Sequence, residues 1–196
     1  MGDAPWSPAA FEDRYAATAD PWDFASSPYE QGRYAAILAS LRPRPHRYRV
    51  GYEPACSVGV LTEALLDRCD VVVATDVSPT AVARARQRCA GRPGAVISVG
   101  AVQDGPGTAV APDLVVFSEV GYYFDRHELR AVTEDLVRTA GAGADLVACH
   151  RTGESVDHRL GGAEVPEVLG HALAGRADHL GGAVHDGFVL DTWQLR

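Results

Sequence analysis

Two residue types are absent from this 196-residue sequence, which contains neither lysine nor asparagine. All 18 basic residues are therefore arginines. Walker-type phosphate-binding loops, Schiff-base enzymes and protein kinases each need a lysine at the reactive or phosphate-binding position. The missing lysine excludes these classes. It also disfavours the short-chain reductases, which use a Tyr-x-x-x-Lys arrangement.

Cysteine is scarce, and its positions do not form a metal-binding pattern. Cys56, Cys69, Cys89 and Cys149 include no C-x-x-C pair, and no two histidines have the spacing of a metal site. We therefore expect no structural zinc and a metal-independent chemistry.

Long apolar runs are missing as well. No run approaches the roughly 18 apolar residues of a membrane-spanning helix. Residues 1–6 are polar and contain a proline, unlike a signal peptide. We expect no membrane partner and a reduced, cytoplasmic protein.

The charge balance is acidic, with a formal net charge of -8 and a pI near 5.3. Nucleic acids and anionic membranes bind basic surfaces, so neither is an expected partner, and a small-molecule substrate fits better. With 46% hydrophobic and 22% charged residues, the composition predicts one globular α/β domain over residues 1–196. No apolar stripe in the sequence indicates an oligomeric state.

The strongest local pattern predicts a βαβ unit that ends in an acid. It consists of a strand and a turn of small residues at 48–59, an amphipathic helix at 60–67 and an apolar strand at 71–76. Small residues let the backbone N–H groups approach a ligand at the carboxyl ends of the strands. Asp76 is then placed to accept hydrogen bonds from two ribose hydroxyls. The alternative is that Asp76 only caps the helix that follows Ser78.

Residues 1–47 are expected to form a helical lid and a proline-stiffened linker. Two helices separated by an aromatic turn fit the pattern, with Ser26 or Ser27 capping the second ahead of Pro28. The aromatic residues of this segment either pack a helix onto the sheet or also cover a cofactor. They are Trp22, Phe24, Tyr29 and Tyr34.

The remaining elements alternate between strand and helix. Strands are expected at 95–99, 113–118, 145–150, 176–180 and 188–195, and helices at 79–89, 126–139 and 164–174. A glycine-rich loop joins the last two strands into a hairpin. Alternating strands and helices closed by a hairpin predict a doubly wound α/β sheet with an antiparallel edge.

Two cofactor classes use such a first βαβ unit, the dinucleotides and S-adenosyl-L-methionine. A dinucleotide fold needs a G-x-G-x-x-G turn, of which only Gly59 is present, and usually a second half for which the chain is too short. A terminal hairpin after five alternating strands resembles the seven-stranded Rossmann-like sheet of class I methyltransferases. S-adenosyl-L-methionine is therefore the expected cofactor.

Several short motifs are more specific than a glycine turn alone. They are Tyr15, Asp20-Pro-Trp22, Tyr29-Glu30, Cys56-Ser-Val-Gly-Val-Leu-Thr62, Thr75-Asp-Val-Ser78, Ser118-Glu-Val120 with Tyr122-Tyr123, and His150-Arg151. Together they resemble the NodS family of S-adenosylmethionine-dependent N-methyltransferases, over residues 11–196. The resemblance implies methyl transfer to the amine that is exposed when a chitooligosaccharide loses an N-acetyl group. Relatives of this type resemble tailoring enzymes of other sugars and small metabolites.

The βαβ unit and the resemblance together define the expected cofactor-binding residues. These are Trp22, Tyr29, Arg33, Glu53, Ala55, Cys56, Ser57, Gly59, Asp76, Val77, Ala101, Val102 and Ser118. The chain departs from the family pattern twice, because Ala55 replaces a turn glycine and Ala101 replaces the acid expected at the adenine. An alanine with a positive φ costs about 1 kcal/mol, enough to weaken binding several-fold. Asp104, or the backbone of residues 101–102, is expected to replace the missing acid.

Methyl transfer needs an unprotonated nucleophile aligned with the methyl group in a site shielded from water. Glu119, at the end of a predicted strand, is the first candidate to orient an amine or take its proton. Tyr122 is expected to supply a hydroxyl contact or a wall, and His150 is a candidate general base because its unperturbed pKa lies near neutrality. Arg151 and His158 are candidate sugar contacts. The structural alternatives are a cap for Glu119, core packing for Tyr122 and a buried hydrogen bond for His150.

The sequence leaves three functions open. The first is an N-methyltransferase of an amino sugar, resembling a deacetylated chitooligosaccharide, or of a related small amine. The second is a small-molecule O-methyltransferase with His150 as its base, which would show a steeper pH dependence. The third is a non-catalytic partner protein with the same fold, suggested by Ala55 and Ala101. Weak or absent cofactor binding would favour the third.

Overall fold

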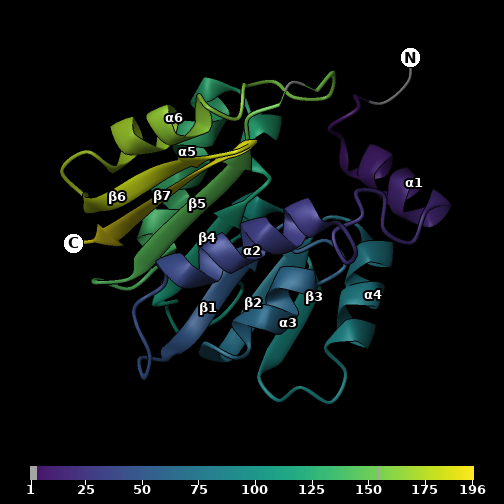
Figure 1. Ribbon diagram of the computed structural model, residues 1–196, viewed down its shortest axis with the longest axis horizontal. Helices are drawn as coiled ribbons and strands as arrows, with labels where there is room; N and C mark the ends of the chain where they lie inside the picture. Colours follow the sequence, from purple (N-terminus) through teal and green to yellow (C-terminus); the bar gives the residue numbers. More distant parts are fainter. Residues whose placement is uncertain (1–3, 154) are drawn as a thin grey trace.

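In the parts of the chain that the structure describes, residues 4–153 and 155–196, seven strands form one mixed sheet in the computed structural model (Figure 1). The strands are β1 (Tyr48–Pro54), β2 (Cys69–Asp76), β3 (Ala95–Val99), β4 (Leu114–Ser118), β5 (Asp145–Arg151), β6 (Ala177–His185) and β7 (Phe188–Leu195). Their order is β3-β2-β1-β4-β5-β7-β6. The first five pair in parallel, and β7 runs antiparallel to both β5 and β6. The predicted doubly wound sheet with a C-terminal hairpin is confirmed.

Helices cover both faces of the sheet and bury two separate hydrophobic cores. One face carries α2 (Pro28–Ser40), α3 (Val60–Leu65) and α4 (Pro79–Arg88), and the other carries α5 (Arg126–Thr139) and α6 (Val165–Leu173). Ile37 and Leu65 are fully buried in the first core, and Leu129 and Leu169 in the second. Because both faces are covered, β2, β4 and β5 contain continuous apolar runs rather than alternating patterns. No helix in the described part of the chain is long and apolar enough to cross a membrane.

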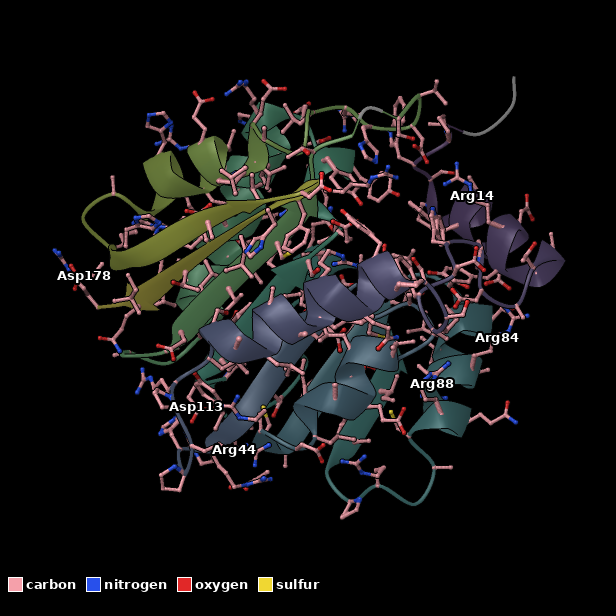
Figure 2. All side chains as sticks on the ribbon, viewed as in Figure 1. Arg14, Arg44, Arg84, Arg88, Asp113 and Asp178 are labelled. Carbon is pink, nitrogen blue, oxygen red and sulfur yellow. The ribbon has the colours of Figure 1, made fainter. Side chains whose placement is uncertain are left out.

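The first helix, α1 (Pro8–Ala17), packs against α4 at the edge of the molecule (Figure 1). Glu12 accepts hydrogen bonds from the Ser78 hydroxyl at 2.5 Å and the Thr80 backbone N–H at 3.1 Å. Arg84, labelled in Figure 2, donates to the Tyr15 carbonyl at 2.7 Å. The middle and the C-terminal part of α1 are thereby anchored to α4, above the carboxyl ends of the parallel strands.

The C-terminal hairpin differs from the prediction, because the expected glycine-rich loop lies inside a strand. Gly181 and Gly182 belong to β6, and the turn lies at residues 186–187. A Cβ on Gly182 would come within 2.3 Å of the Asp191 carboxylate on β7, so the glycine leaves space for this side chain. Since β6 is an edge strand with exposed residues on both faces, it lacks the alternation that identifies a strand in a sequence.

The second helix begins where the sequence predicts. Pro28 is its first residue and Ser27 occupies the N-cap position, although the Ser27 side chain makes no capping hydrogen bond. The helix of the βαβ unit is shorter than predicted, ending at Leu65 rather than at residue 67.

The chain reverses its winding direction between β1 and β4, which lie side by side in parallel. The connection after β1 runs through α3 on one face, whereas that after β4 leads to α5 on the other. Doubly wound sheets bind ligands in the crevice outside the carboxyl ends of the strands at such a switch point. Ala55 and Glu119 are among the residues that follow these two strands.

Candidate active site

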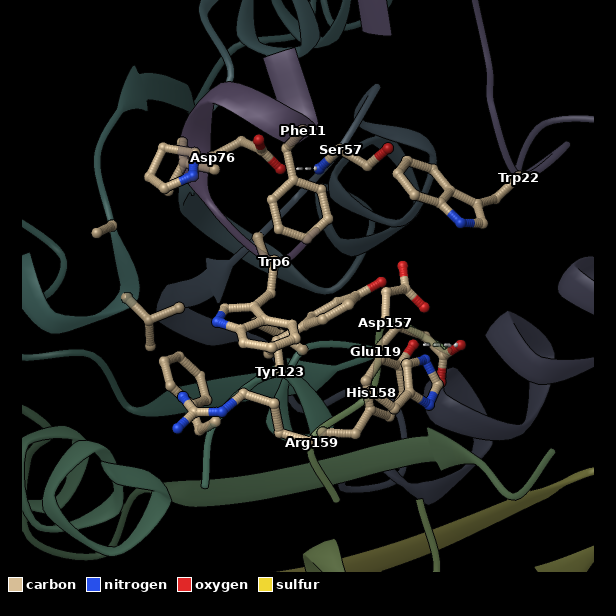
Figure 3. Close-up of a pocket in the computed structure, with 18 of the residues that line it drawn as sticks. Trp6, Phe11, Trp22, Ser57, Asp76, Glu119, Tyr123, Asp157, His158 and Arg159 are labelled. Atoms are coloured by element: carbon tan, nitrogen blue, oxygen red, sulfur yellow. Dashed lines mark hydrogen bonds between the residues drawn. The ribbon is translucent and has the colours of Figure 1, made fainter. Parts of the chain in front are cut away.

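A cavity of about 430 Å³ lies at the carboxyl ends of the parallel strands (Figure 3). Many of the site residues predicted from the sequence line this cavity. They are Ala55 and Ser57 after β1, Asp76 and Val77 after β2, Ala101 and Val102 after β3, Glu119 and Tyr122 after β4, and Trp22 from the loop after α1. Its volume falls within the range of small-molecule sites, about 300–1,000 Å³. The structure thus brings together predicted cofactor and catalytic residues in one cavity.

A second group of predicted residues lines a smaller cavity, of about 30 Å³, next to the first. The group consists of Arg33, Glu53, Cys56 and Ser118. The two cavities share Ala55, Ser57 and Glu119, so the smaller one lies behind the turn after β1.

Two predicted cofactor residues line neither cavity. Gly59 has a φ of +79°, and an added Cβ would lie 2.8 Å from the Cβ of Ala85, so this glycine allows α3 to pack on α4. Tyr29 donates its hydroxyl proton to the Gly187 carbonyl at 2.9 Å and packs edge-on against Phe188. The structure therefore places Gly59 at a helix contact and Tyr29 against the C-terminal hairpin.

His150 does not line the cavity, which corrects its prediction as a general base. The side chain is fully buried, and its Nε2 accepts a hydrogen bond from the Gly121 backbone N–H at 3.0 Å. Burial, with the positive charge of Arg33, lowers the pKa of His150 to about 3, so the ring is neutral at physiological pH. Its structural role is to hold the short 3₁₀ turn (Gly121–Tyr123) that carries Tyr122.

Asp76 accepts a hydrogen bond at the start of α4, as the structural alternative predicted, and it also lines the cavity. One carboxylate oxygen accepts from the Ser78 backbone N–H at 2.9 Å and the other accepts from the Ser57 backbone N–H at 2.9 Å. The Ser57 hydroxyl in turn accepts a hydrogen bond from Tyr15 of α1 at 2.6 Å. Asp76 therefore ties the turn after β1 to the start of α4, and the two predictions for this residue do not compete.

Ala55 adopts the left-handed conformation expected for the glycine that it replaces, with a φ of +58°. An alanine in this conformation costs about 1 kcal/mol, which lowers the stability of the fold.

Ala55→Gly is expected to raise the free energy of unfolding by about 1 kcal/mol and the melting temperature by about 2–4 °C. Affinity for S-adenosylhomocysteine should stay within about two-fold, because the backbone conformation is already set. Thermal unfolding and calorimetric titration measure the two quantities.

Ala35→Gly is the matched control, because Ala35 is exposed in the interior of α2 and has ordinary helical geometry. There the same change should lower stability by about 1 kcal/mol. If both variants were less stable than the unmodified protein, the claim that Ala55 has a strained backbone would be wrong.

Glu53 is a buried acid with an unusual charge state. Its side chain accepts a hydrogen bond from the Thr62 hydroxyl at 2.6 Å, and burial raises its pKa to about 8. Its folded pKa thus lies above the unfolded value, so its stabilising contribution is complete below the unfolded pKa and is lost as the pH rises through about 8.

Glu53→Gln is expected to gain stability relative to the unmodified protein as the pH rises from 5 to 9, by a few kcal/mol. Glutamine keeps an acceptor for Thr62 but cannot ionise, so the cost of burying a charge disappears. Urea unfolding of both proteins at several pH values measures the difference. Parallel stability curves would show that Glu53 titrates normally.

Glu119 has the most constrained geometry of the predicted catalytic residues. Its φ is +57°, an uncommon conformation that clusters at functional sites. One carboxylate oxygen accepts from the Arg151 backbone N–H at 2.7 Å, and the other accepts from the Tyr122 hydroxyl at 3.2 Å. Burial raises the pKa of Glu119, and the positive charge of Arg33 opposes that rise.

The guanidinium of Arg33 lies between the carboxylates of Glu30 and Glu119, which both line the cavity. It is almost fully buried, pairs with Glu30, lies 4.0 Å from Glu119, and donates to the Ser118 hydroxyl at 2.6 Å. Burial lowers the pKa of Arg33, but the negative charges of Glu119 and Glu30 raise it by more than burial lowers it. The arginine therefore stays charged. With both carboxylates ionised, the cluster carries one excess negative charge and favours a cation in the cavity.

The end of the cavity beside β3 corrects one prediction and adds a residue. Asp104 accepts a hydrogen bond from the Ala101 backbone N–H at 2.9 Å and does not line the cavity, so it is not placed to replace the missing acid. Gln103 does line the cavity. It lies in a 3₁₀ turn (Val102–Asp104). No motif or periodicity in the sequence indicated that this glutamine would reach the cavity.

Several further cavity residues come from segments that are distant in sequence. They are Trp6, Phe11, Tyr123, Asp157 and Arg159, all labelled in Figure 3. Phe11 of α1 packs edge-on against Tyr123 at 5.0 Å between ring centroids, and Arg14 pairs with Asp157 at 2.9 Å. These contacts make α1 and the segment after β5 the two sides of the cavity mouth. The described residues contain no group of three or more side chains suited to hold a metal ion.

Comparison with known proteins finds related sequences and structures. Residues 10–171 match the family model described as Nodulation protein S (NodS). Nodulation protein S of Rhizobium tropici is 32% identical over 137 residues, which are 69% of this chain and 56% of that protein. The chain thus spans little more than half the length of that relative. Nodulation protein S of Bradyrhizobium diazoefficiens is 30% identical over 170 residues, covering 83% of this chain and 78% of that protein.

Among solved structures, the N-methyltransferase NodS from Bradyrhizobium japonicum WM9, in complex with S-adenosyl-L-homocysteine, has the same fold. The two superpose with a TM-score of 0.79 at 23% sequence identity. The match covers 96% of this chain and 98% of the other.

Proposed function

We propose that this chain methylates the amine of an amino sugar or a related small amine. The chain belongs to the NodS family and is an S-adenosylmethionine-dependent methyltransferase. The observation that carries the proposal is the placement of Glu119. Its carboxylate lines the cavity at the end of β4, in a cluster with excess negative charge. A carboxylate there attracts an ammonium group and orients the amine derived from it.

The proposed cofactor site extends over the ends of β1, β2 and β3. Asp76 would accept hydrogen bonds from the ribose hydroxyls, and the backbone at Ala55 and Ser57 would approach the amino-acid tail. Val102 and Gln103 would contact the adenine in place of the missing acid. When bound, S-adenosyl-L-methionine supplies a methyl group on a sulfonium leaving group.

The proposed acceptor site lies between Glu119 and the aromatic residues from α1. Phe11 and Trp22 offer apolar faces that suit the C–H face of a sugar ring, with ring centroids 6.3 Å apart. The cofactor and the acceptor would share a cavity of about 430 Å³, which favours a small acceptor. α1 and this acceptor together would keep water from the reacting atoms.

The proposal treats residues 1–196 as one metal-independent methyltransferase domain, with residues 1–47 providing the lid and the linker. Residues 1–3 of that segment lie outside the described residues. The lid function is supported by Phe11 and Tyr15, which line the cavity from α1.

The structure removes the main argument for each of the two alternatives, O-methylation and a non-catalytic protein. O-methylation relied on His150 as a base, and that ring does not line the cavity. The non-catalytic alternative relied in part on Ala55, which adopts the left-handed conformation of the glycine that it replaces. Amine methylation needs no strong base, because a neutral amine is already a nucleophile.

Methyl transfer to paired acceptors tests the proposal. The protein is incubated with S-adenosyl-L-methionine and either chitobiose, which has free amines, or its N,N′-diacetyl form, and the products are analysed by mass spectrometry. We expect one added methyl group on chitobiose and none on the acetylated sugar. Equal methylation of both sugars would indicate an oxygen acceptor. No transfer to these sugars, to glucosamine or to simple amines would overturn the proposed function.

A further inference from the structure

The cavity wall contains a histidine, His158, in the segment that follows β5 (Figure 3). Its ring stacks on that of Tyr122, with 3.7 Å between centroids and 17° between planes, and meets Tyr123 edge-on at 5.5 Å. The backbone N–H groups of Arg159 and Leu160 donate to the Tyr122 carbonyl at 2.8 and 3.2 Å. These ring contacts and backbone hydrogen bonds hold the imidazole against Tyr122 and Tyr123.

The imidazole of His158 makes no side-chain hydrogen bond to another described residue. Its Nδ1 is buried without a partner, as is Nδ1 of His150. His150, however, uses its Nε2 to accept from the Gly121 backbone, and Nε2 of His179 bonds to Asp191. A preorganised cavity imidazole with an unused nitrogen suits a role toward a ligand.

Tyr122 links His158 to the carboxylate that orients the acceptor. Its ring carries the stacked imidazole, and its hydroxyl donates to Glu119 at 3.2 Å. Glu119 and His158 both line the cavity, and Figure 3 shows them on the same wall. An amine beside Glu119 would therefore have the imidazole nearby.

The groups around His158 keep it neutral near pH 7. Burial lowers its pKa, Asp157 opposes this shift, and Arg151 adds to it. Burial raises the pKa of Tyr122 and Tyr123, so both phenols stay protonated at neutral pH. The other facing groups are Glu119, whose pKa burial raises, and His150, whose pKa of about 3 leaves it uncharged.

We infer that His158 is a further catalytic residue, accepting the proton that the acceptor ammonium must lose for its nitrogen to attack. This inference rests on the proposed function and deepens it. The nitrogen lone pair forms the new N–C bond as the C–S bond breaks, and the bonding electrons convert the sulfonium to a neutral thioether. The proton passes from nitrogen to the imidazole, which releases it to solvent. Glu119 orients the amine while His158 takes the proton.

The test compares pH profiles of methyl transfer to chitobiose by the whole protein and by two variants. His158→Phe keeps the aromatic stack on Tyr122 without a basic nitrogen, and His158→Gln keeps polarity. At pH 7 we expect kcat/KM of both variants to fall about 10²-fold or more. At pH 9.5 the acceptor loses its proton to solvent, so most of the activity should return. His171→Gln, at an exposed position in α6, is the matched control and should retain the normal profile.

Three results would overturn the inference. A His158→Phe profile that superimposes on that of the unmodified enzyme would remove His158 from proton transfer. A loss that persists at pH 9.5, in variants that bind S-adenosylhomocysteine normally, would show a purely structural role. An unmodified enzyme that methylates no amine at all would overturn the proposed function first and this role with it.

Discussion

Asp76→Ala is expected to raise the dissociation constant for S-adenosylhomocysteine about 100-fold. The change removes the acceptors proposed for two ribose hydroxyls, and each hydrogen bond to a charged group is worth roughly 1.5–3 kcal/mol. Calorimetric titration measures the loss. Unchanged affinity would contradict the placement of the cofactor across the ends of β1 and β2.

The same variant should also be less stable, a consequence that the sequence alone did not indicate. Its carboxylate accepts from two backbone N–H groups, at Ser57 and Ser78, and each donor left unpaired costs about 1–3 kcal/mol. Ser78→Ala is the control. It removes the side-chain cap of α4, which bonds the Ala81 N–H at 3.0 Å, but Ser78 does not line the cavity. This control should lose stability and keep its affinity.

Glu119→Gln is expected to lower kcat about 10²-fold or more and to leave the affinity for S-adenosylhomocysteine within about three-fold. Glutamine fits the same space: its amide oxygen can accept from the Arg151 N–H, and its amide N–H can donate to the Tyr122 hydroxyl oxygen in place of the bond that Glu119 accepts. It loses the negative charge that attracts and orients an ammonium group. Steady-state kinetics with chitobiose, together with calorimetry, separates turnover from cofactor binding.

Glu134→Gln provides the matched control for this charge removal. Glu134 lies on α5, pairs with Arg130 at 3.5 Å and does not line the cavity. Its variant should behave like the unmodified enzyme. Equal turnover of the Glu119 and Glu134 variants would remove Glu119 from the mechanism.

The fold could be predicted from the sequence because its signals are local. The strands at 71–76, 113–118 and 145–150 are apolar runs bounded by acids or small residues, and they became β2, β4 and β5 with end shifts of at most a few residues. The edge strand β6 carries no such signal, since it has little to bury. Its two glycines suggested a loop, whereas Gly182 makes room for Asp191.

The strand-end residues of the site could also be predicted, because the topology of the sheet fixes where parallel strands end. Asp76 and Glu119 reach the cavity for this reason. The sequence cannot tell which way a strand-end side chain points in a sheet covered on both faces. His150 therefore looked like a base, although its ring turns into the core.

The opposite wall of the cavity could not be predicted, because it depends on long-range packing. Trp6 and Phe11 come from the start of the chain, whereas Asp157 and Arg159 come from an irregular segment after β5. No periodicity or spacing connects residues so far apart in sequence. Only the docking of α1 on α4 brings them together.

The most direct test of the account is the position of the transferred methyl group. The protein is incubated with chitobiose and S-adenosyl-L-methionine carrying a ¹³C-labelled methyl group, and the product is examined by NMR. Attachment to nitrogen and attachment to oxygen give well-separated carbon shifts and different couplings to the sugar ring. The account predicts a single labelled methyl on an amine nitrogen. A labelled methyl on a hydroxyl oxygen would contradict it.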